Sequence, residues 1–123
     1  MRILVIDDDN DIREIISAVL AAEGHEVVGA VDGVAALDPL QRDGRPTLIL
    51  LDMMMPRLDG EGFIKAMRSD PNLADIPVVI LTAHPGARAK ASELGAAGCL
   101  RKPVELTDLL AAVEGTRLRA TAP

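Results

Sequence analysis

The feature that most constrains the fold is a set of short apolar runs without alternating polar residues. Four such runs lie at residues 3–6, 27–28, 48–51 and 78–81, and a weaker fifth lies at 98–100. A continuous apolar run predicts a strand covered on both faces, as in a parallel sheet. We therefore expect five strands, most of them fully buried.

Amphipathic segments separate these runs. Apolar residues recur at i, i+3, i+4, i+7 and i+8 in the first segment, at positions 12, 15, 16, 19 and 20. This spacing predicts a helix that Asn10 or Asp11 caps and Gly24 ends. Similar spacing marks helices around 63–67, around 87–94 and from about Glu105 to about Leu118. A helix after Asp32-Gly33 is less regular, because Pro39 should kink or shorten it.

The order of strands and helices predicts the fold class. Strand and helix alternate five times, and right-handed crossovers wind such a chain into a parallel sheet with helices on both faces. We expect a flavodoxin-like, doubly wound (βα)5 α/β fold with strand order 2-1-3-4-5. The sequence shows no internal linker, so residues 1–123 should form one domain.

Polar residues end the predicted strands at the edge where ligands bind in open parallel sheets. They are Asp7, Asp8 and Asp9 after the first strand, Asp52 after the third, Thr82 after the fourth, and Lys102 followed by Pro103 after the fifth. The expected strand order makes these ends neighbours. Any one residue could be a solvated helix cap, but chance does not readily explain polar ends on all four strands.

Carboxylates that gather in one cleft repel one another unless a cation joins them. Carboxylate oxygens without His or Cys suit Mg²⁺, which binds a few carboxylates and retains several waters. Together with a hydroxyl and an ammonium group, such a site meets the needs of phosphoryl transfer to a carboxylate. Neither a P-loop nor a dinucleotide-binding glycine motif follows the first strand, so nucleotide binding is not supported.

Composition excludes several partners. Phe63 is the only aromatic residue, which leaves no surface for stacking nucleic-acid bases. The net charge of −6 disfavours nucleic acid and anionic membranes. The longest apolar runs are too short to cross a bilayer, and Cys99 is the single cysteine, so no internal disulfide can form. These properties predict a cytoplasmic protein.

The ordered set of motifs resembles a response-regulator receiver domain of two-component signalling. The motifs that carry the resemblance are Asp7-Asp8, Asp52-Met53-Met54-Met55-Pro56 with Gly60, Thr82-Ala83, Gly95-Ala96 and Lys102-Pro103. Each is weak alone, but together they span nearly the whole chain in the family's order. The resemblance implies a phosphoprotein that catalyses only its own phosphorylation and dephosphorylation, and so is not a turnover enzyme.

The resemblance also implies a role for each matching residue. Asp52 would accept a phosphoryl group from a sensor histidine kinase or a histidine phosphotransfer protein. Asp8 and Asp52 would ligate Mg²⁺ directly, Asp7 would act through water, and the carbonyl of Met54 would complete the site. Thr82 and Lys102 would hold phosphoryl oxygens, and the bond before Pro103 would be cis.

One departure concerns the switch. In such domains, phosphorylation draws the residue at Thr82 inward together with an aromatic ring on the fifth strand, but Cys99 stands at that position. The usual coupling therefore cannot operate in its common form. Cys99 is best explained as a small buried hydrophobe, with a redox role as the alternative. The resemblance implies that a downstream protein binds the face formed by the predicted segments 87–94, 98–100 and 105–118, and we expect a monomer or weak dimer.

Two other functions remain open from the sequence. A receiver-like fold could act as an interaction module that needs no phosphorylation, an interpretation that Cys99 keeps open. Asp7-x-Asp9 after an apolar strand, with Thr82 and Lys102, also resembles haloacid-dehalogenase phosphohydrolases, in which the first Asp is the nucleophile. Asp11 stands where that family expects Thr or Val, and the chain is short for that fold.

Overall fold

The computed structural model describes residues 1–36, 45–53, 59–83 and 86–121. Its strands are β1 (Arg2–Ile6), β2 (Glu26–Ala30), β3 (Leu48–Asp52), β4 (Val78–Thr82) and β5 (Gly98–Arg101). Its helices are α1 (Asn10–Ala22), α3 (Gly60–Arg68), α4 (Ala87–Glu93) and α5 (Leu106–Thr121). Strand and helix alternate as the sequence predicts, except between β2 and β3, where the described chain shows only a helical turn at residues 33–36 and residues 37–44 lie outside it.

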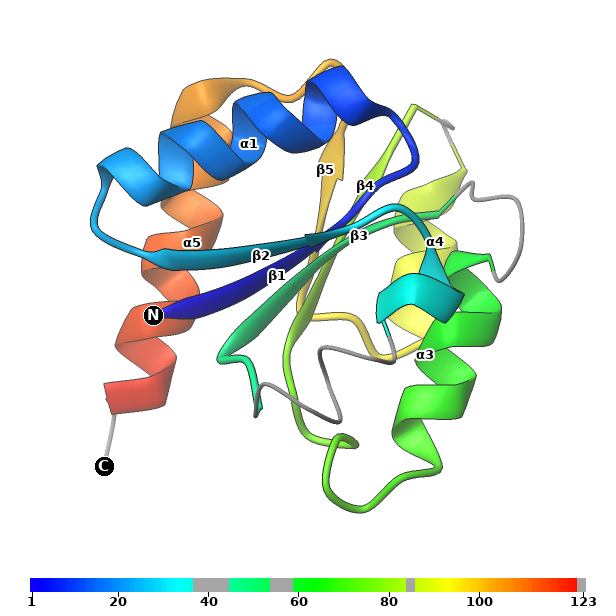
Figure 1. Ribbon diagram of the computed structural model, residues 1–123. Helices are drawn as coiled ribbons and strands as arrows, with labels where there is room; N and C mark the ends of the chain where they lie inside the picture. Colours follow the sequence, from blue (N-terminus) through cyan, green and yellow to red (C-terminus); the bar gives the residue numbers. More distant parts are fainter. Residues whose placement is uncertain (37–44, 54–58, 84–85, 122–123) are drawn as a thin grey trace.

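The five strands form one parallel sheet in the order β2-β1-β3-β4-β5. Helices α1 and α5 cover one face of this sheet, and α3 and α4 cover the other (Figure 1). The expected flavodoxin-like α/β fold and its strand order are therefore confirmed. This topology places the carboxyl ends of β1, β3, β4 and β5 side by side at one edge.

Two apolar cores lie on opposite faces of the sheet. Alternate residues of β1 serve the two sides: Leu4 and Ile6 pack in the core that includes Phe63 of α3, and Ile3 and Val5 pack in the core under α1 and α5. Strands β3 and β4 are buried along their whole length, whereas the edge strands β2 and β5 are partly exposed. Continuous apolar runs thus predict the central strands best, because only those strands have two covered faces and two neighbours.

Several element boundaries differ from those expected. Asp9, and not Asn10 or Asp11, caps α1, since its side chain accepts hydrogen bonds from the main-chain N–H groups of Asp11 and Ile12. Helix α5 begins at Leu106 and continues to Thr121, beyond the expected end at Leu118. Residues 33–36 form a helical turn, whereas Pro39 lies outside the described residues and its expected effect is untested.

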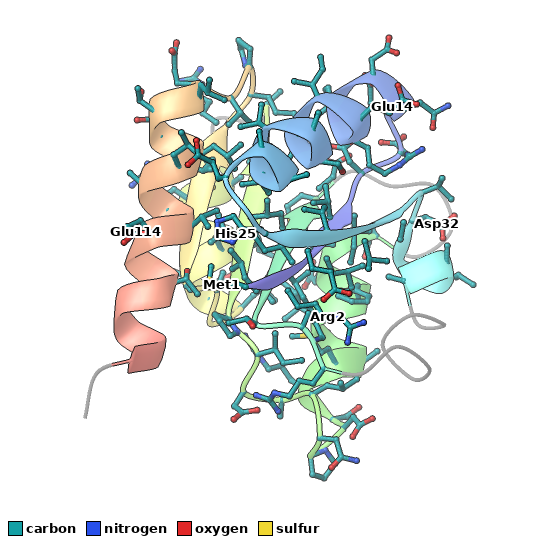
Figure 2. All side chains as sticks on the ribbon, turned by 60° about the vertical axis from the view of Figure 1, so that its left-hand side comes forward. Met1, Arg2, Glu14, His25, Asp32 and Glu114 are labelled. Carbon is teal, nitrogen blue, oxygen red and sulfur yellow. The ribbon has the colours of Figure 1, made fainter. Side chains whose placement is uncertain are left out.

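At the other end of the sheet, where the strands begin, the amino terminus of the chain connects β1 to β2. The amino group of Met1 lies 3.0 Å from Nδ1 of His25, and both residues precede a strand (Figure 2). The main-chain N–H of Glu26 also donates to the carbonyl of Met1, at 2.9 Å. These bonds fix the start of β1 against the start of β2, far from the polar strand ends. No described helix is long and apolar enough to cross a membrane.

Candidate functional site

The turn after β1 delivers the first two acidic residues of the site. Asp7 is fully buried, whereas Asp8 is exposed. The N–H of Asp7 donates to the carbonyl of Ala30 on β2 at 3.1 Å, and the N–H of Asp9 donates to Oδ1 of Asp7 at 2.9 Å. These bonds extend the β1–β2 pairing by one residue and hold the Asp7 carboxylate at the mouth of the sheet.

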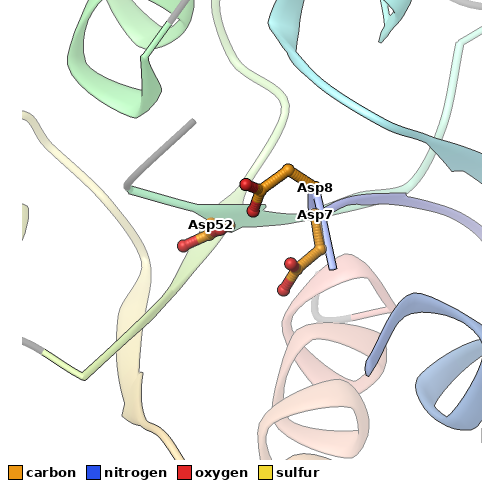
Figure 3. Close-up of side chains that lie close together, drawn as sticks. All are labelled: Asp7, Asp8 and Asp52. Atoms are coloured by element: carbon orange, nitrogen blue, oxygen red, sulfur yellow. The ribbon is translucent and has the colours of Figure 1, made fainter. Parts of the chain in front are cut away.

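Asp52 completes an acidic cluster as the last residue of β3, the strand beside β1. Its side chain is buried, and one carboxylate oxygen from each of Asp7, Asp8 and Asp52 lies within 4.8 Å of the other two (Figure 3). Two of the three carboxylates are therefore held together inside the protein, where repulsion is strongest, and the third borders solvent. Parallel pairing of β1 with β3 produces this convergence.

Lys102 supplies a positive charge from the end of β5. Its Nζ lies 2.9 Å from Oδ2 of Asp7 and 3.5 Å from Oδ1 of Asp52. Burial by itself lowers the pKa of Lys102, but contact with Asp7 and the charge of Asp52 outweigh burial and raise the pKa above its ordinary value of 10.5. The ammonium group therefore remains charged at neutral pH and bridges two buried carboxylates.

Thr82 and Pro103 complete the expected set within the described residues. Thr82 is buried at the end of β4, one residue after Leu81, which pairs with Asp52 in the sheet. The main-chain carbonyl of Thr82 accepts a hydrogen bond from the main-chain N–H of Lys102 at 2.8 Å. The Lys102–Pro103 peptide is cis. The structure thus brings all these residues to one edge, but Met54 lies outside the described residues and its proposed carbonyl ligand is not placed.

The donor set fits a hard divalent cation. Oδ2 of Asp7 is buried and receives no hydrogen bond of acceptable geometry, although Lys102 Nζ lies near it. Three carboxylates against one ammonium group leave a formal charge of −2, which one divalent ion balances. Carboxylate oxygens without His or Cys are the ligands that Mg²⁺ prefers. This acidic triad is therefore able to hold a metal.

Cys99 lies on β5 opposite Ile80 of β4 and is partly buried against the core that contains α3 and α4. Burial raises the pKa of the Cys99 thiol, and the charge of Arg88 offsets only part of this effect. A thiol that stays protonated is a weak nucleophile. The surroundings of Cys99 therefore favour packing over the redox alternative.

Three sets of contacts at the site were not anticipated from the sequence, although Gly60 itself belongs to the motifs that carry the resemblance. Arg13 of α1 donates a hydrogen bond to the main-chain carbonyl of Asp7 at 2.8 Å. Gly60 approaches the end of β3 so closely that a Cβ there would lie 2.8 Å from Cα of Met53. Nζ of Lys90 on α4 lies 3.1 Å from Oε1 of Glu61 on α3. Both residues line a groove of about 340 Å³ that Thr82 also borders. Spacing along the chain signals the i,i+4 pair of Glu61 with Lys65, but not these contacts across elements.

Comparison with known proteins identifies the family. Residues 3–114 match the response regulator receiver domain. The chain belongs to this family. It is 42% identical over 125 residues to the response regulator MprA of Mycobacterium avium, a match that covers 100% of this chain and 53% of that protein. The receiver thus spans about half the length of the curated relatives it matches.

Solved receiver structures agree with this assignment. The chemotaxis protein CheY4 of Vibrio cholerae superposes with a TM-score of 0.85 at 32% identity, over 94% of this chain and 97% of that one. The receiver domain of the Francisella response regulator 1452 gives a TM-score of 0.87 at 29% identity, over 98% of both chains. The fold and the acidic pocket are therefore those of a two-component receiver, a signalling module rather than a turnover enzyme. Such a domain implies a histidine kinase partner, and the phosphohydrolase alternative is set aside.

Proposed function

We propose that this receiver accepts a phosphoryl group on Asp52 from a histidine kinase or a histidine phosphotransfer protein and signals through a conformational change. The observation that carries the proposal is the meeting of three carboxylates within 4.8 Å, with the ammonium of Lys102 3.5 Å from Asp52. A buried cluster of this charge is costly to maintain for packing alone. Phosphoryl transfer would explain the cluster, because that reaction brings a cation and an anionic phosphoryl group to these carboxylates.

The chemistry follows from the groups at the mouth of the sheet. A carboxylate oxygen of Asp52 attacks phosphorus, a P–O bond forms, and the P–N bond to the donor imidazole breaks. The electron pair of that bond returns to the imidazole nitrogen, and the ring leaves as neutral imidazole with a single proton, which its other nitrogen already carries or which the ring takes up from solvent. The product is an acyl phosphate on Asp52 and a free histidine on the donor.

Residues around Asp52 would hold the transferred group. We assign Lys102 and the hydroxyl of Thr82 to phosphoryl oxygens, and Asp7, Asp8, Asp52 and the carbonyl of Met54 to Mg²⁺. When bound, Mg²⁺ would supply positive charge where negative charge gathers on phosphorus. Lys102 already lies between Asp7 and Asp52, so a phosphoryl group on Asp52 arrives beside a fixed cation. The ammonium group of Lys102 and the bound Mg²⁺ would thus together lower the free-energy cost of adding negative charge to a buried site.

The output surface is proposed to be the face formed by α4, β5 and α5, bound by a downstream protein. A groove of about 570 Å³ follows this face, and its lining carries both signs of charge, from Arg88 and Arg101 to Glu105 and Asp108. We further propose that residues 1–123 form a single receiver domain that acts in the cytoplasm as a monomer or weak dimer, without nucleic acid or membrane as a partner. The net charge of −6 supports the last point.

Phosphorylation by a small donor tests the proposal. Protein incubated with acetyl phosphate and MgCl₂ should gain one phosphoryl group by intact mass, and hydroxylamine should remove it. Chelation of Mg²⁺ with EDTA should abolish the gain. Asp9→Asn is a matched control, because Asp9 stands beside the site but caps α1, a role that Asn also fills.

The two variants should behave differently. Asp9→Asn should be phosphorylated like the unchanged protein, and Asp52→Asn should not be labelled. Equal labelling of Asp52→Asn and the unchanged protein would show that another group accepts the phosphoryl group. A folded receiver with no labelling from either acetyl phosphate or a kinase would instead favour an interaction module.

A further inference from the structure

One side chain outside the proposed ligand set contacts the turn that carries Asp7 and Asp8. Arg13, in the first part of α1, reaches back toward the end of β1. One of its terminal nitrogens, Nη1, donates to the main-chain carbonyl of Asp7 at 2.8 Å, and Nη2 donates to Oδ1 of Asn10 at 2.6 Å. The guanidinium group therefore bridges the two ends of the segment that leads from β1 into α1.

The carbonyl that Arg13 binds belongs to the peptide unit that joins Asp7 to Asp8. A peptide unit is planar, so fixing its oxygen also fixes the direction in which the chain leaves toward the Cα of Asp8. The other contacts of Asp7 hold its N–H and its carboxylate: the N–H donates to Ala30 on β2, and Oδ1 accepts from the N–H of Asp9. Arg13 thus restrains the peptide unit that leads from the buried Asp7 to the exposed Asp8.

Strand β2 leaves room for the stem of Arg13. Gly29 lies opposite Val5 of β1, and a Cβ added at Gly29 would lie 3.2 Å from Cδ and 3.5 Å from Cγ of Arg13. The backbone at Gly29 does not have a positive φ, so its conformation does not require glycine. The absence of a side chain at this position therefore serves the close passage of the Arg13 stem.

We propose that Arg13 is a positioning residue for metal binding, seated by Gly29, that orients the Asp7–Asp8 turn through the Asp7 carbonyl. The inference rests on the proposed function, because it takes Asp7 and Asp8 as residues that hold Mg²⁺. Arg13 does not itself bind the ion. It acts through the main chain, and its contribution lies in the geometry of the two carboxylates.

A competing explanation assigns Arg13 an electrostatic role only. A positive charge near three carboxylates reduces their repulsion in the absence of metal and also opposes the approach of a cation. On that explanation, removal of the charge tightens Mg²⁺ binding, and Lys in place of Arg changes nothing. The positioning role gives the opposite result, because one ammonium group cannot bridge Asp7 and Asn10 as the planar fork of Arg does.

The test measures Mg²⁺ affinity directly, without phosphorylation. Chemical shifts of backbone amides are followed during titration with MgCl₂ at constant ionic strength, for the unchanged protein, Arg13→Lys, Arg13→Met and Gly29→Ala. We expect Arg13→Lys to weaken Mg²⁺ binding about tenfold, the low end of the range for the loss of a group that supports metal ligands. Gly29→Ala should weaken binding in the same direction, because it displaces the Arg13 stem and leaves the guanidinium group intact.

Arg68→Lys is the matched control. Arg68 also donates to main-chain carbonyls, those of Ala74, Ile76 and Gly95, but these lie between elements at the opposite edge of the sheet. Its replacement should lower the thermal midpoint and leave Mg²⁺ affinity unchanged. A thermal midpoint for each variant without Mg²⁺ separates loss of stability from loss of affinity.

Each outcome decides between the explanations. Unchanged affinity in folded Arg13→Lys, or tighter binding in Arg13→Met, would overturn the positioning role. Weaker binding in Arg13→Lys and Gly29→Ala, with Arg68→Lys unaffected, would support it. If the unchanged protein shows no saturable Mg²⁺ binding, the metal site of the proposed function fails and the inference fails with it, so the two failures are distinguishable.

Discussion

At the scale of single residues, the charge balance of the pocket depends on Lys102. Its Nζ contacts one carboxylate oxygen of each of the two buried acidic residues, Asp7 and Asp52, and only 17% of its side chain is exposed. An ion pair in such surroundings contributes little net stability compared with apolar residues, but removal of one partner leaves an uncompensated charge. The site is therefore sensitive to the loss of this one ammonium group.

Replacement of Lys102 by Met should lower the free energy of unfolding by about 1–3 kcal/mol near neutral pH without Mg²⁺. This loss is smaller than for a fully buried ion pair, because the site borders solvent at the exposed Asp8. The pKa of Lys102 is raised in the folded protein, so its stabilising contribution is fully present below 10.5 and is lost only as pH rises through the higher folded value. Urea denaturation at several pH values measures the difference between the two proteins.

The matched control is Lys65→Met, because Lys65 forms an exposed pair with Glu61 and 68% of its side chain is accessible. Its replacement should hardly change stability. A difference between the unchanged protein and Lys102→Met that is lost as pH rises from neutral, before pH reaches 10.5, would contradict the assigned pKa direction.

Gly60 controls the position of the end of β3. A Cβ at Gly60 would lie 2.7 Å from Sδ and 2.8 Å from Cα of Met53, and the second of these is main chain that must shift. Gly60→Ala should therefore cost about 1–3 kcal/mol of stability and slow phosphorylation of the adjacent Asp52. Chemical denaturation and the rate of labelling by acetyl phosphate measure the two effects.

Gly115→Ala provides the comparison, since a Cβ there meets nothing within 4 Å and the position is helical. It should stabilise α5 by about 0.5–1 kcal/mol and leave the labelling rate unchanged. Equal stability of Gly60→Ala and the unchanged protein would show that the end of β3 can yield to the extra atom.

At the scale of elements, the sequence determines most of the architecture because the signals are local. Apolar runs without alternation identify β1, β3 and β4, and crossover handedness leaves few sheet orders to consider. The polar strand ends then follow, which is why Asp7, Asp8, Asp52, Thr82 and Lys102 could be placed at one edge. Arg13 and Lys90 could not, because their partners lie on other elements and depend on side-chain paths that periodicity does not encode.

The switch is also an element-scale property. Cys99 on β5 provides no ring to follow Thr82 inward, so activation should move the segment from Thr82 to Pro85, of which residues 84 and 85 lie outside the described part of the chain, and leave β5 nearly unchanged. Amide chemical shifts before and after addition of beryllofluoride with Mg²⁺ measure this. Large shifts centred on Cys99, with Thr82 unaffected, would contradict the prediction.

Cys99→Ala tests whether the thiol is simply part of the core. The change should cost roughly 1 kcal/mol by leaving a small cavity, and phosphorylation should persist. Loss of phosphorylation in a stable Cys99→Ala protein would instead give the thiol a part in the chemistry.

At the scale of the whole molecule, ligand binding and stability are linked. The apo pocket holds carboxylates that repel one another, and a cation that binds only the folded protein shifts the unfolding equilibrium. Mg²⁺ at ten times its dissociation constant should add about 1.4 kcal/mol to the free energy of unfolding. Thermal unfolding with and without MgCl₂ should show this gain for the unchanged protein and a much smaller one for Asp8→Asn. An equal gain in both would place the ion elsewhere.

Mapping of the acyl phosphate along the chain shows whether Asp52 carries the phosphoryl group. Borohydride reduces an aspartyl phosphate to homoserine, a permanent mark that survives proteolysis and sequencing by mass spectrometry. After treatment with acetyl phosphate and Mg²⁺, we expect homoserine at position 52 and an unmodified side chain at positions 7 and 8. Homoserine at position 7, with Asp52 intact, would show that Asp7 accepts the phosphoryl group and would restore the phosphohydrolase-like assignment of the nucleophile.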